Sequence, residues 1–319
     1  MEPRDDNPEF FELAYEGAQI RALATEIAGG KWKKFAEFQL RSLIVLCFGD
    51  VAEAAAHSVL DRLAPLEFPV VISRRLPHYT GALDVVLVLG EQDPMERLHV
   101  VQSAHDRGAL TALIDSGMQG VAEEAPSATL RLGTPLGSGV VESPLRYAGA
   151  IYSSYQLLRG DYSDLGAELY RVADAVDQEL ANLAPSVSYS ENAARQLRNL
   201  ATEYAIIHSG QLSIARMVSA LWAACGLHCC ALSRPELWKR LRTQPQPDIF
   251  HDPYVDPEAT VLPSKVVMWG AYPTEAEAEL GSTRVENATQ VNTGSLEELL
   301  ILVVRGFSAT TYSVSPEDC

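Results

Sequence analysis

The chain of 319 residues carries 42 acidic against 25 basic side chains, a formal charge of −17, and 47% of its residues are hydrophobic. A surface this acidic repels nucleic-acid backbones and anionic lipids, so we expect neither a nucleic acid nor a membrane as partner. No apolar run reaches the ~18 residues of a membrane span, and the acidic start Met1–Asp6 lacks the apolar core of a secretory signal. We therefore expect a cytoplasmic protein of about two domains.

The five cysteines are too few and too scattered for a disulfide framework, which favours a reduced protein. Cys225, Cys229 and Cys230 lie near His228 and raise the question of a metal site. Adjacent cysteines on a strand point to opposite faces, which is poor geometry for chelation. We therefore expect no metal and interpret these side chains as small buried core residues.

The first half of the chain begins with one or two amphipathic helices over residues 8–41, broken at Gly29 and Gly30. Apolar runs then alternate with helical patterns, which is typical of a parallel sheet covered by helices. The expected strands are Leu43–Cys47, Pro69–Ser73, Asp84–Gly90 and Leu110–Asp115, and the expected helices are Val51–Leu63, Pro94–Arg107 and Pro144–Leu158.

The second half repeats this organisation after a long acidic helix, Tyr162–Ala184. Its expected strands are Tyr204–His208, Leu227–Leu232 and Lys265–Gly270, and its expected helices are Leu212–Ala224, Pro235–Arg242, Glu275–Leu280 and a final one starting near Ser295. The pattern predicts an α/β protein with two parallel-sheet domains in tandem. The predicted parts are N-terminal helices over 1–41, a first domain over 42–160, a linking helix over 161–185 and a second domain over 186–319.

Two segments, Arg41–Leu60 and Asp84–Ala104, each combine an apolar strand, a short loop and an amphipathic helix. In a doubly wound sheet such loops lie side by side at the carboxyl ends of the strands, where ligands bind. The candidate ligand-binding residues of these two loops are Gly49, Asp50, Gly90, Glu91 and Asp93. The corresponding strand end of the second domain adds His208, Ser209 and Gly210.

In order and spacing, the stretch from about Ser42 to Ser313 resembles the tandem sugar-isomerase (SIS) domain family, in particular the bacterial and archaeal bifunctional phosphoglucose/phosphomannose isomerases. The first loop of that family, GMGGSA, corresponds to CFGDVA at Cys47–Ala52, and the second, SYSGNTEETL, to LGEQDPMERL at Leu89–Leu98. The resemblance implies two SIS-type, flavodoxin-like domains, a homodimer, a small sugar-derived ligand and no cofactor.

The two loops lack most of the groups that bind phosphate in the family. In the family, glycine backbones and Ser/Thr hydroxyls bind the phosphate. In this chain the positions of those hydroxyls include Val51 and Leu89. Asp50, Glu91 and Asp93 place carboxylates where the phosphate would sit, and we interpret them as acids of helix N-caps and first turns. The basic residues that could pair with an anion instead are Arg74, Arg75 and Arg146.

The catalytic motifs are also incomplete by this resemblance. The family helix RWKxxxNENxK corresponds to Arg216–Gly226, which places Ala223 where the base glutamate belongs. The motif PElnHNE corresponds to Pro247–Pro253 and makes His251 the ring-opening histidine, although a hydrogen-bonded surface histidine is the simpler interpretation. The family helix with a catalytic lysine has no counterpart before Cys319.

Two hypotheses about function follow from these motifs. The first is a catalytically impaired, phosphosugar isomerase-like protein that binds a carbohydrate derivative or regulates sugar metabolism. The second is an active glucose-6-phosphate/mannose-6-phosphate isomerase, an aldose–ketose isomerase that uses residues outside the aligned motifs. The first is favoured, because a missing general base costs roughly 10²–10⁴ in rate.

Overall fold

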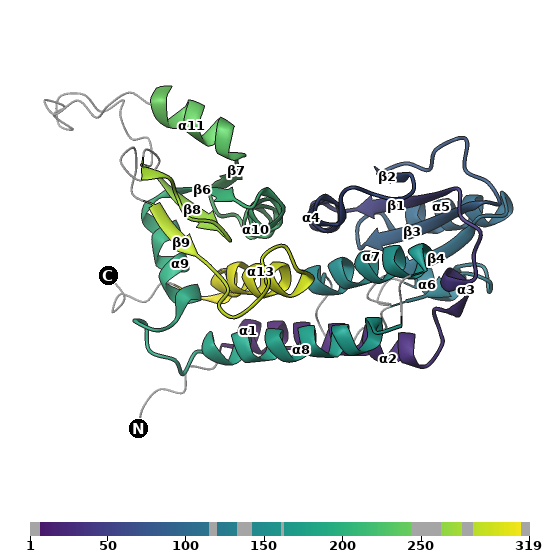
Figure 1. Cartoon of the computed structure of the whole chain (residues 1–319), viewed down its shortest axis with the longest axis horizontal. Helices are drawn as coiled ribbons and strands as arrows, with labels where there is room; N and C mark the ends of the chain where they lie inside the picture. The colour runs from purple at the N-terminus through teal and green to yellow at the C-terminus, as the bar shows by residue number, and fades with distance from the viewer. Residues whose placement is uncertain are drawn as a thin grey trace, which may run out of the picture.

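The computed structural model describes residues 7–114, 120–132, 142–160, 163–243, 263–275 and 283–313. These residues form two parallel sheets that lie side by side, with helices on their faces (Figure 1). The two predicted parallel-sheet domains are therefore confirmed. No helix in the described ranges is long and apolar enough to cross a membrane.

The first sheet has the strand order β2-β1-β3-β4-β5. Its strands are β1 (Ser42–Phe48), β2 (Val70–Ser73), β3 (Asp84–Gly90), β4 (Leu110–Ile114) and β5 (Leu130–Arg131). Its helices are α4 (Asp50–Leu63), α5 (Pro94–Asp106), α6 (Val121–Glu124) and α7 (Pro144–Arg159). β1 and β3 are neighbours, as predicted, with a register that runs from Ser42 opposite Asp84 to Phe48 opposite Gly90. The two strands therefore end at the same level.

Alternate residues of β1 and β3 face opposite sides, because side chains on a strand alternate. Leu43 and Val45 pack with α4 and α7 on one face, whereas Ile44 and Leu46 pack with α5 and α6 on the other. All of these positions are buried, which explains why β1 and β3 are apolar runs rather than alternating sequences.

The second sheet has the order β7-β6-β8-β9. Its strands are β6 (Ala205–Gly210), β7 (Cys229–Ala231), β8 (Ser264–Trp269) and β9 (Thr283–Glu286). Its helices are α9 (Ala193–Glu203), α10 (Leu212–Ala224), α11 (Arg234–Thr243) and α13 (Leu296–Thr311). β9, β5 and α9 were not predicted, and the predicted helix over 275–280 lies outside the described residues except for its first residue. α10 has the predicted bounds.

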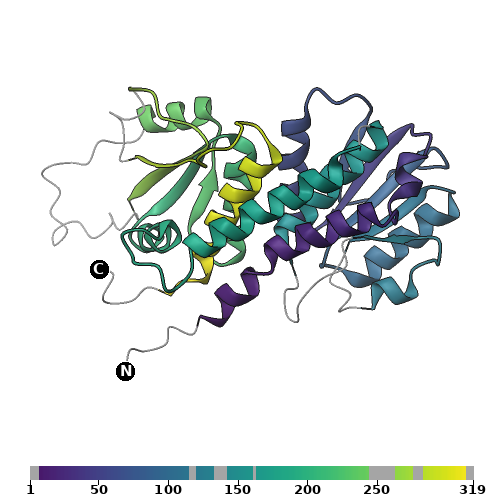
Figure 2. The same cartoon turned by 60° about the horizontal axis from the view of Figure 1, so that its bottom comes forward.

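The remaining helices are α1 (Pro8–Leu13), α2 (Glu16–Ala28), α3 (Lys33–Ala36) and α8 (Leu165–Asn182). α8 falls in the predicted linking segment, but it packs along its length against α2 and also against α13. Figure 2 shows purple α2 beside teal α8, running across both halves of the molecule. The segment between the domains is therefore part of the packed structure.

Candidate functional site

The order β2-β1-β3-β4-β5 reverses direction between β1 and β3, and ligands of such sheets bind in the crevice at this switch point. Two loops meet there, one at Gly49 and one at Gly90. At Gly90, φ is +101° and an added Cβ would lie 2.1 Å from the Phe48 carbonyl oxygen, so only glycine permits this approach. The backbone N–H of Gln92 also donates to that oxygen at 3.2 Å.

The Glu91 side chain is buried between two arginines at the switch point of the first sheet, called the first switch point from here on. Its Oε2 lies 3.6 Å from Arg97 Nη1, and its Oε1 lies 3.7 Å from Arg146 Nη2. Both guanidinium groups are fully buried, and Arg97 also donates to the Gly90 carbonyl at 2.6 Å. The prediction that Glu91 belongs to the first turn of a helix is wrong, because α5 begins at Pro94. Glu91 is instead the acid of a buried cluster that holds two positive charges.

Arg146 provides hydrogen-bond donors that the described residues leave unused. It lies in the first turn of α7, and none of its three guanidinium nitrogens has a hydrogen-bond partner there. Buried polar groups without such partners are rare in proteins and point to function or to a ligand. Next to it, the Tyr147 hydroxyl donates to Glu91 Oε1 at 3.4 Å. Burial, followed by the Glu91 charge, raises the pKa of Tyr147 well above its ordinary value.

Glu16 of α2 accepts hydrogen bonds from residues at the start of α7. Its Oε2 accepts hydrogen bonds from Ser143 Oγ at 2.9 Å and from the Leu145 N–H at 3.0 Å. The carboxyl group is completely buried, and this desolvation raises its pKa to about 7, although both hydrogen bonds and the Arg146 charge oppose the rise. Glu16 therefore holds the residues that directly precede Arg146 at the start of α7.

The other acids of the loops have separate roles. Asp50 is the first residue of α4, as predicted for a first-turn acid, and it pairs at the surface with Arg74. Asp93 is the N-cap of α5 in a left-handed conformation, but its side chain makes no capping bond. Glu142 lies over Gly49, and burial together with the Asp50 charge raises its pKa. Its buried Oε1 has no hydrogen-bond partner among the described residues.

The second sheet has its own switch point between β6 and β8, where the strands end at Gly210 and Trp269. The Gln211 side chain fills it: Nε2 donates to the Gly270 carbonyl at 2.8 Å, and Oε1 accepts from Arg62 Nη2 at 2.5 Å. Ser209 Oγ donates to the Leu232 carbonyl at 2.8 Å. At this switch point the Gln211 and Ser209 side chains therefore bond to other groups of the protein.

His208 lies inside the second domain between two tryptophans. Its Nδ1 accepts from Trp269 Nε1 at 3.0 Å, and its ring stands edge-on to Trp222 with centroids 4.7 Å apart. Burial lowers its pKa to about 3, so the ring is neutral at physiological pH. The structure thus brings together Gly49, Asp50, Gly90, Glu91 and Asp93 in one domain and places His208, Ser209 and Gly210 in the other. His251 lies outside the described residues, and its role stays a prediction.

Sequence analysis missed four members of the first switch point: Glu16, Arg97, Glu142 and Tyr147. The helical pattern contained one signal for Arg97. It stands beside Leu98 and one turn before Val101, both of which are buried, so a charge there implies a buried partner. Glu16 and Glu142 carried no local signal, because their contacts come from distant parts of the chain.

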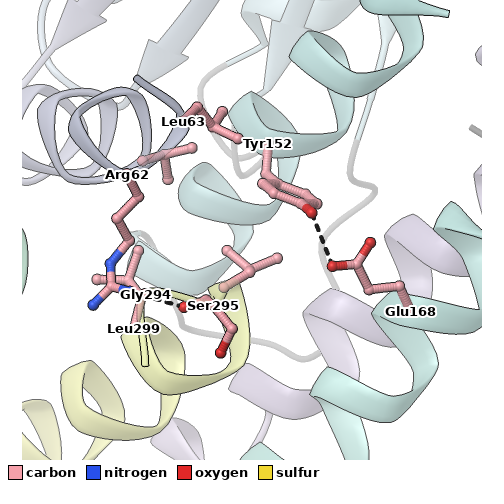
Figure 3. A pocket seen from close by; sticks show the side chains of 9 residues that line it. Arg62, Leu63, Tyr152, Glu168, Gly294, Ser295 and Leu299 are labelled. Carbon is pink, nitrogen blue, oxygen red and sulfur yellow. Dashed lines mark hydrogen bonds between the residues drawn. The ribbon is translucent and has the colours of Figure 1, made fainter. Parts of the chain in front are cut away.

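A cavity of about 150 Å³ opens between the two domains, among α4, α7, α8 and the start of α13 (Figure 3). Its lining residues are Val59, Arg62, Leu63, Tyr152, Glu168, Gly294, Ser295, Leu296 and Leu299. On one wall the Tyr152 hydroxyl donates to Glu168 Oε1 at 2.8 Å. The volume matches that of a cavity known to hold benzene, so it has room for a single small ring.

The described part of the chain contains no group of three or more His, Cys, Asp or Glu side chains placed to hold a metal ion. No protein-family model matches the sequence, and no curated protein matches it.

Solved structures do resemble the chain. The C-terminal domain of glucosamine-fructose-6-phosphate aminotransferase from Francisella tularensis has a TM-score of 0.58 at 12% identity and covers 94% of each chain. Glucosamine-6-phosphate deaminase from Thermotoga maritima has a TM-score of 0.60 at 8% identity, covering 94% of this chain and 92% of that one. A candidate phosphosugar isomerase from Bacillus subtilis has a TM-score of 0.55 at 12% identity, covering 92% and 94%.

Identities this low establish the fold alone, and the particular likeness to bifunctional phosphoglucose/phosphomannose isomerases stays a prediction. The match extends over both domains and over nearly the full length of each neighbour. The chain therefore has the tandem SIS-type fold that its sequence predicted.

Proposed function

We propose that this protein is a phosphosugar isomerase-like SIS protein that binds a phosphorylated carbohydrate derivative at the first switch point and is impaired as an isomerase. The observation that carries the proposal is the Arg146 guanidinium group, which lies buried at the switch point without a hydrogen-bond partner among the described residues. Guanidinium groups form strong charge-assisted bonds to phosphate oxygens. The names of three structural neighbours, which refer to sugar phosphates or phosphosugars, support the ligand class.

The charges at the first switch point are compatible with an anion. Glu91, which the sequence suggested would repel phosphate, faces two guanidinium groups, and Asp50 is paired with Arg74. Glu91 and Asp50 thus each have a compensating cation nearby, which lowers their repulsion of a phosphate. Glu142 Oε1 supplies an acceptor without a partner among the described residues, suited to a sugar hydroxyl.

Binding measurements on two variants of α4 test this proposal. Asp50→Asn removes a charge at the switch point. Asp61→Asn removes a charge from the same helix at a position eleven residues later, about 16 Å away. In calorimetric titrations with fructose 6-phosphate, Asp50→Asn should bind up to about fivefold more tightly than wild type. Asp61→Asn should bind like wild type. If the wild type does not bind fructose 6-phosphate, or if both variants respond alike, the ligand site is elsewhere.

The proposal that catalysis is impaired rests on Ala223. Ala223, at the aligned position of the base, is an exposed methyl group near the end of α10 and cannot accept a proton. A coupled isomerase assay on the pure protein should show turnover below about 1 s⁻¹ with glucose 6-phosphate or mannose 6-phosphate.

Glu142 is the residue that favours the alternative, an active isomerase. Its raised pKa is a property of general acids and bases, and its carboxylate lies at the first switch point. Turnover above about 1 s⁻¹ that is abolished in Glu142→Gln or His251→Ala would establish the active enzyme and refute impairment.

We also propose that the protein acts in the cytoplasm as a homodimer. The four cysteines within the described residues are free thiols, which suits a reducing compartment. The apolar helix α7 is buried within the protomer and is therefore not the expected interface. Exposed aromatic side chains support an interface at the helical layer instead: Phe11, Tyr15 and Tyr170 are 58%, 48% and 38% exposed. Sedimentation equilibrium at micromolar concentration should give twice the mass of the chain, and a monomer would contradict the proposal.

A further inference from the structure

A second concave site lies on the first domain, in a groove of about 560 Å³ between α5 and the segment that follows β2. One wall is lined by Ser73, Arg75, Leu76, Pro77 and His78, and the other by Glu96, His99, Val100, Ser103 and Arg107. The residues of the second wall are three or four positions apart, so they share one face of α5. The volume is in the range of pockets that hold small organic ligands.

The groove is basic in a protein whose net charge is −17. Two arginines and two histidines line it, against one glutamate. Arg75 and Arg107 are exposed and form no ion pair with the described residues, although acidic residues greatly outnumber basic ones. Arg74 shows the contrast, because it pairs with both Asp50 and Glu53. The two arginines of the groove are therefore able to pair with an anionic ligand.

The two arginines of the groove come from two different elements. Arg75 belongs to the segment after β2, whereas Arg107 follows α5 and is anchored to the first wall by a bond from its Nη1 to the Pro77 carbonyl at 3.0 Å. Ser73 and Ser103 add a hydroxyl to each wall, and the His78 and His99 imidazoles add planar rings. This arrangement suits an anion with charge at more than one point and a ring that can stack on an imidazole.

We propose that this groove binds an organic diphosphate of about the size of a nucleoside diphosphate. Arg75 and Arg107 contact its phosphate oxygens, the histidines lie against its ring, and Glu96 accepts a bond from a hydroxyl. The groove is distinct from the first switch point, because it is lined by none of Asp50, Glu91 and Arg146. The proposal therefore does not depend on the sugar-binding function.

Calorimetric titration of the full chain with ADP tests the site, with adenosine and inorganic pyrophosphate as partial ligands. The double variant Arg75→Gln/Arg107→Gln should weaken ADP binding by at least about tenfold, since the hydrogen bonds from two charged groups are lost. Arg131→Gln is the matched control, because Arg131 is an exposed arginine of β5 in the same domain and is absent from the groove. It should leave the affinity unchanged. Both groove arginines are exposed, so the variants should fold, and melting curves check this.

Three outcomes would overturn the proposal. The first is that neither ADP nor pyrophosphate binds at millimolar concentration. The second is that ADP binds equally well to the double variant, which would place the anion elsewhere in the protein. The third is salt-sensitive self-association that the double variant abolishes without any ADP binding, which would make an acidic protein surface the occupant. Shifts of the His78 and His99 side-chain resonances on addition of ADP, with His57 of α4 unaffected, would support the site directly.

Discussion

At the scale of single residues, the buried Glu16 carboxyl group links the stability of the protein to pH. Its pKa of about 7 in the folded state exceeds the ordinary 4.5, so the folded state holds this proton more tightly than the unfolded state. Between pH 4.5 and pH 7 the contribution of Glu16 to the free energy of unfolding therefore falls as pH rises. The total loss is about 3 kcal/mol and is complete above pH 7.

Glu16→Gln should remove this pH dependence. The amide oxygen can still accept from Ser143 and Leu145, but it cannot become charged, so the variant should gain stability over wild type as pH rises from 5 to 8. Urea denaturation at several pH values measures the difference. Glu9→Gln, at an exposed position of α1, is the control and should follow wild type. A constant difference between Glu16→Gln and wild type across this range would show that Glu16 does not titrate there.

Substitutions at two glycines with positive φ distinguish the cost of backbone strain from the cost of a steric collision. Gly160, at the end of α7, has φ of +89° and no atom within 4 Å of an added Cβ, so Gly160→Ala should cost about 1 kcal/mol. Gly90→Ala adds a collision with the Phe48 carbonyl oxygen to the same strain and should cost at least about 3 kcal/mol. Equal losses in urea denaturation would mean that the two loops of the first switch point can move apart freely.

At the scale of elements, Arg62 of α4 joins the first domain to the second. Its side chain is 8% exposed, Nη1 lies 3.3 Å from Glu298 Oε2 of α13, and Nη1 also donates to the Ser295 carbonyl. Arg62→Met leaves a buried carboxylate without its cation, which should cost about 3–5 kcal/mol. The exposed pair between Arg216 of α10 and Asp61 of α4 provides the control, because Arg216→Met should cost less than about 1 kcal/mol.

A double variant distinguishes loss of the ion pair from loss of packing. If the buried pair is the cause, Arg62→Met/Glu298→Gln should be clearly more stable than the sum of the two single changes predicts. Additive losses in thermal melts would attribute the effect to the packing of the Arg62 stem instead.

Most elements with a long, patterned sequence could be predicted, whereas the short strands β5 and β9 and the longer helix α9 could not. β3 and α10 have the predicted bounds because the buried apolar run Val85–Leu89 and a continuous amphipathic pattern specify them. β5 has only two residues and β9 only four, and pairing with β4 and β8 rather than their own sequence makes them strands.

The location of the first switch point could also be predicted, but its chemistry could not. The loops after β1 and β3 follow from the strand–loop–helix pattern, which is local in sequence. The bond between Glu16 and Ser143 joins residues 127 positions apart, and the pairing of Glu91 with Arg146 likewise depends on the tertiary fold. A carboxylate in a loop looks the same in sequence whether it caps a helix or lies between two buried guanidinium groups.

At the scale of the whole molecule, one hydrophobic core extends through both domains. The same cluster of buried side chains contains Val45 of β1, Ile151 of α7, Val176 of α8, Met217 of α10 and Leu302 of α13. α4 and α10 face each other between the two sheets, and Ser58 Oγ of α4 donates to the Ser213 carbonyl of α10 at 2.6 Å. Neither domain can unfold without exposing apolar surface of the other.

We therefore expect the two domains to unfold as a single cooperative unit. Amides of β1 and β6, buried in separate sheets, should exchange hydrogen through the same global opening, so their exchange free energies should converge as denaturant is added. The physical reason is that opening the second domain would expose α4 and α8, which costs about 25 cal/mol for each Å² of apolar surface.

Hydrogen exchange read by mass spectrometry measures both strands in one experiment. Arg62→Met should lower both free energies by the same amount, because it weakens a contact that only the joined domains possess. Exchange of β6 at a lower free energy than β1, with only β6 responding to Arg62→Met, would mean that the domains open independently and that the shared core adds little to their coupling.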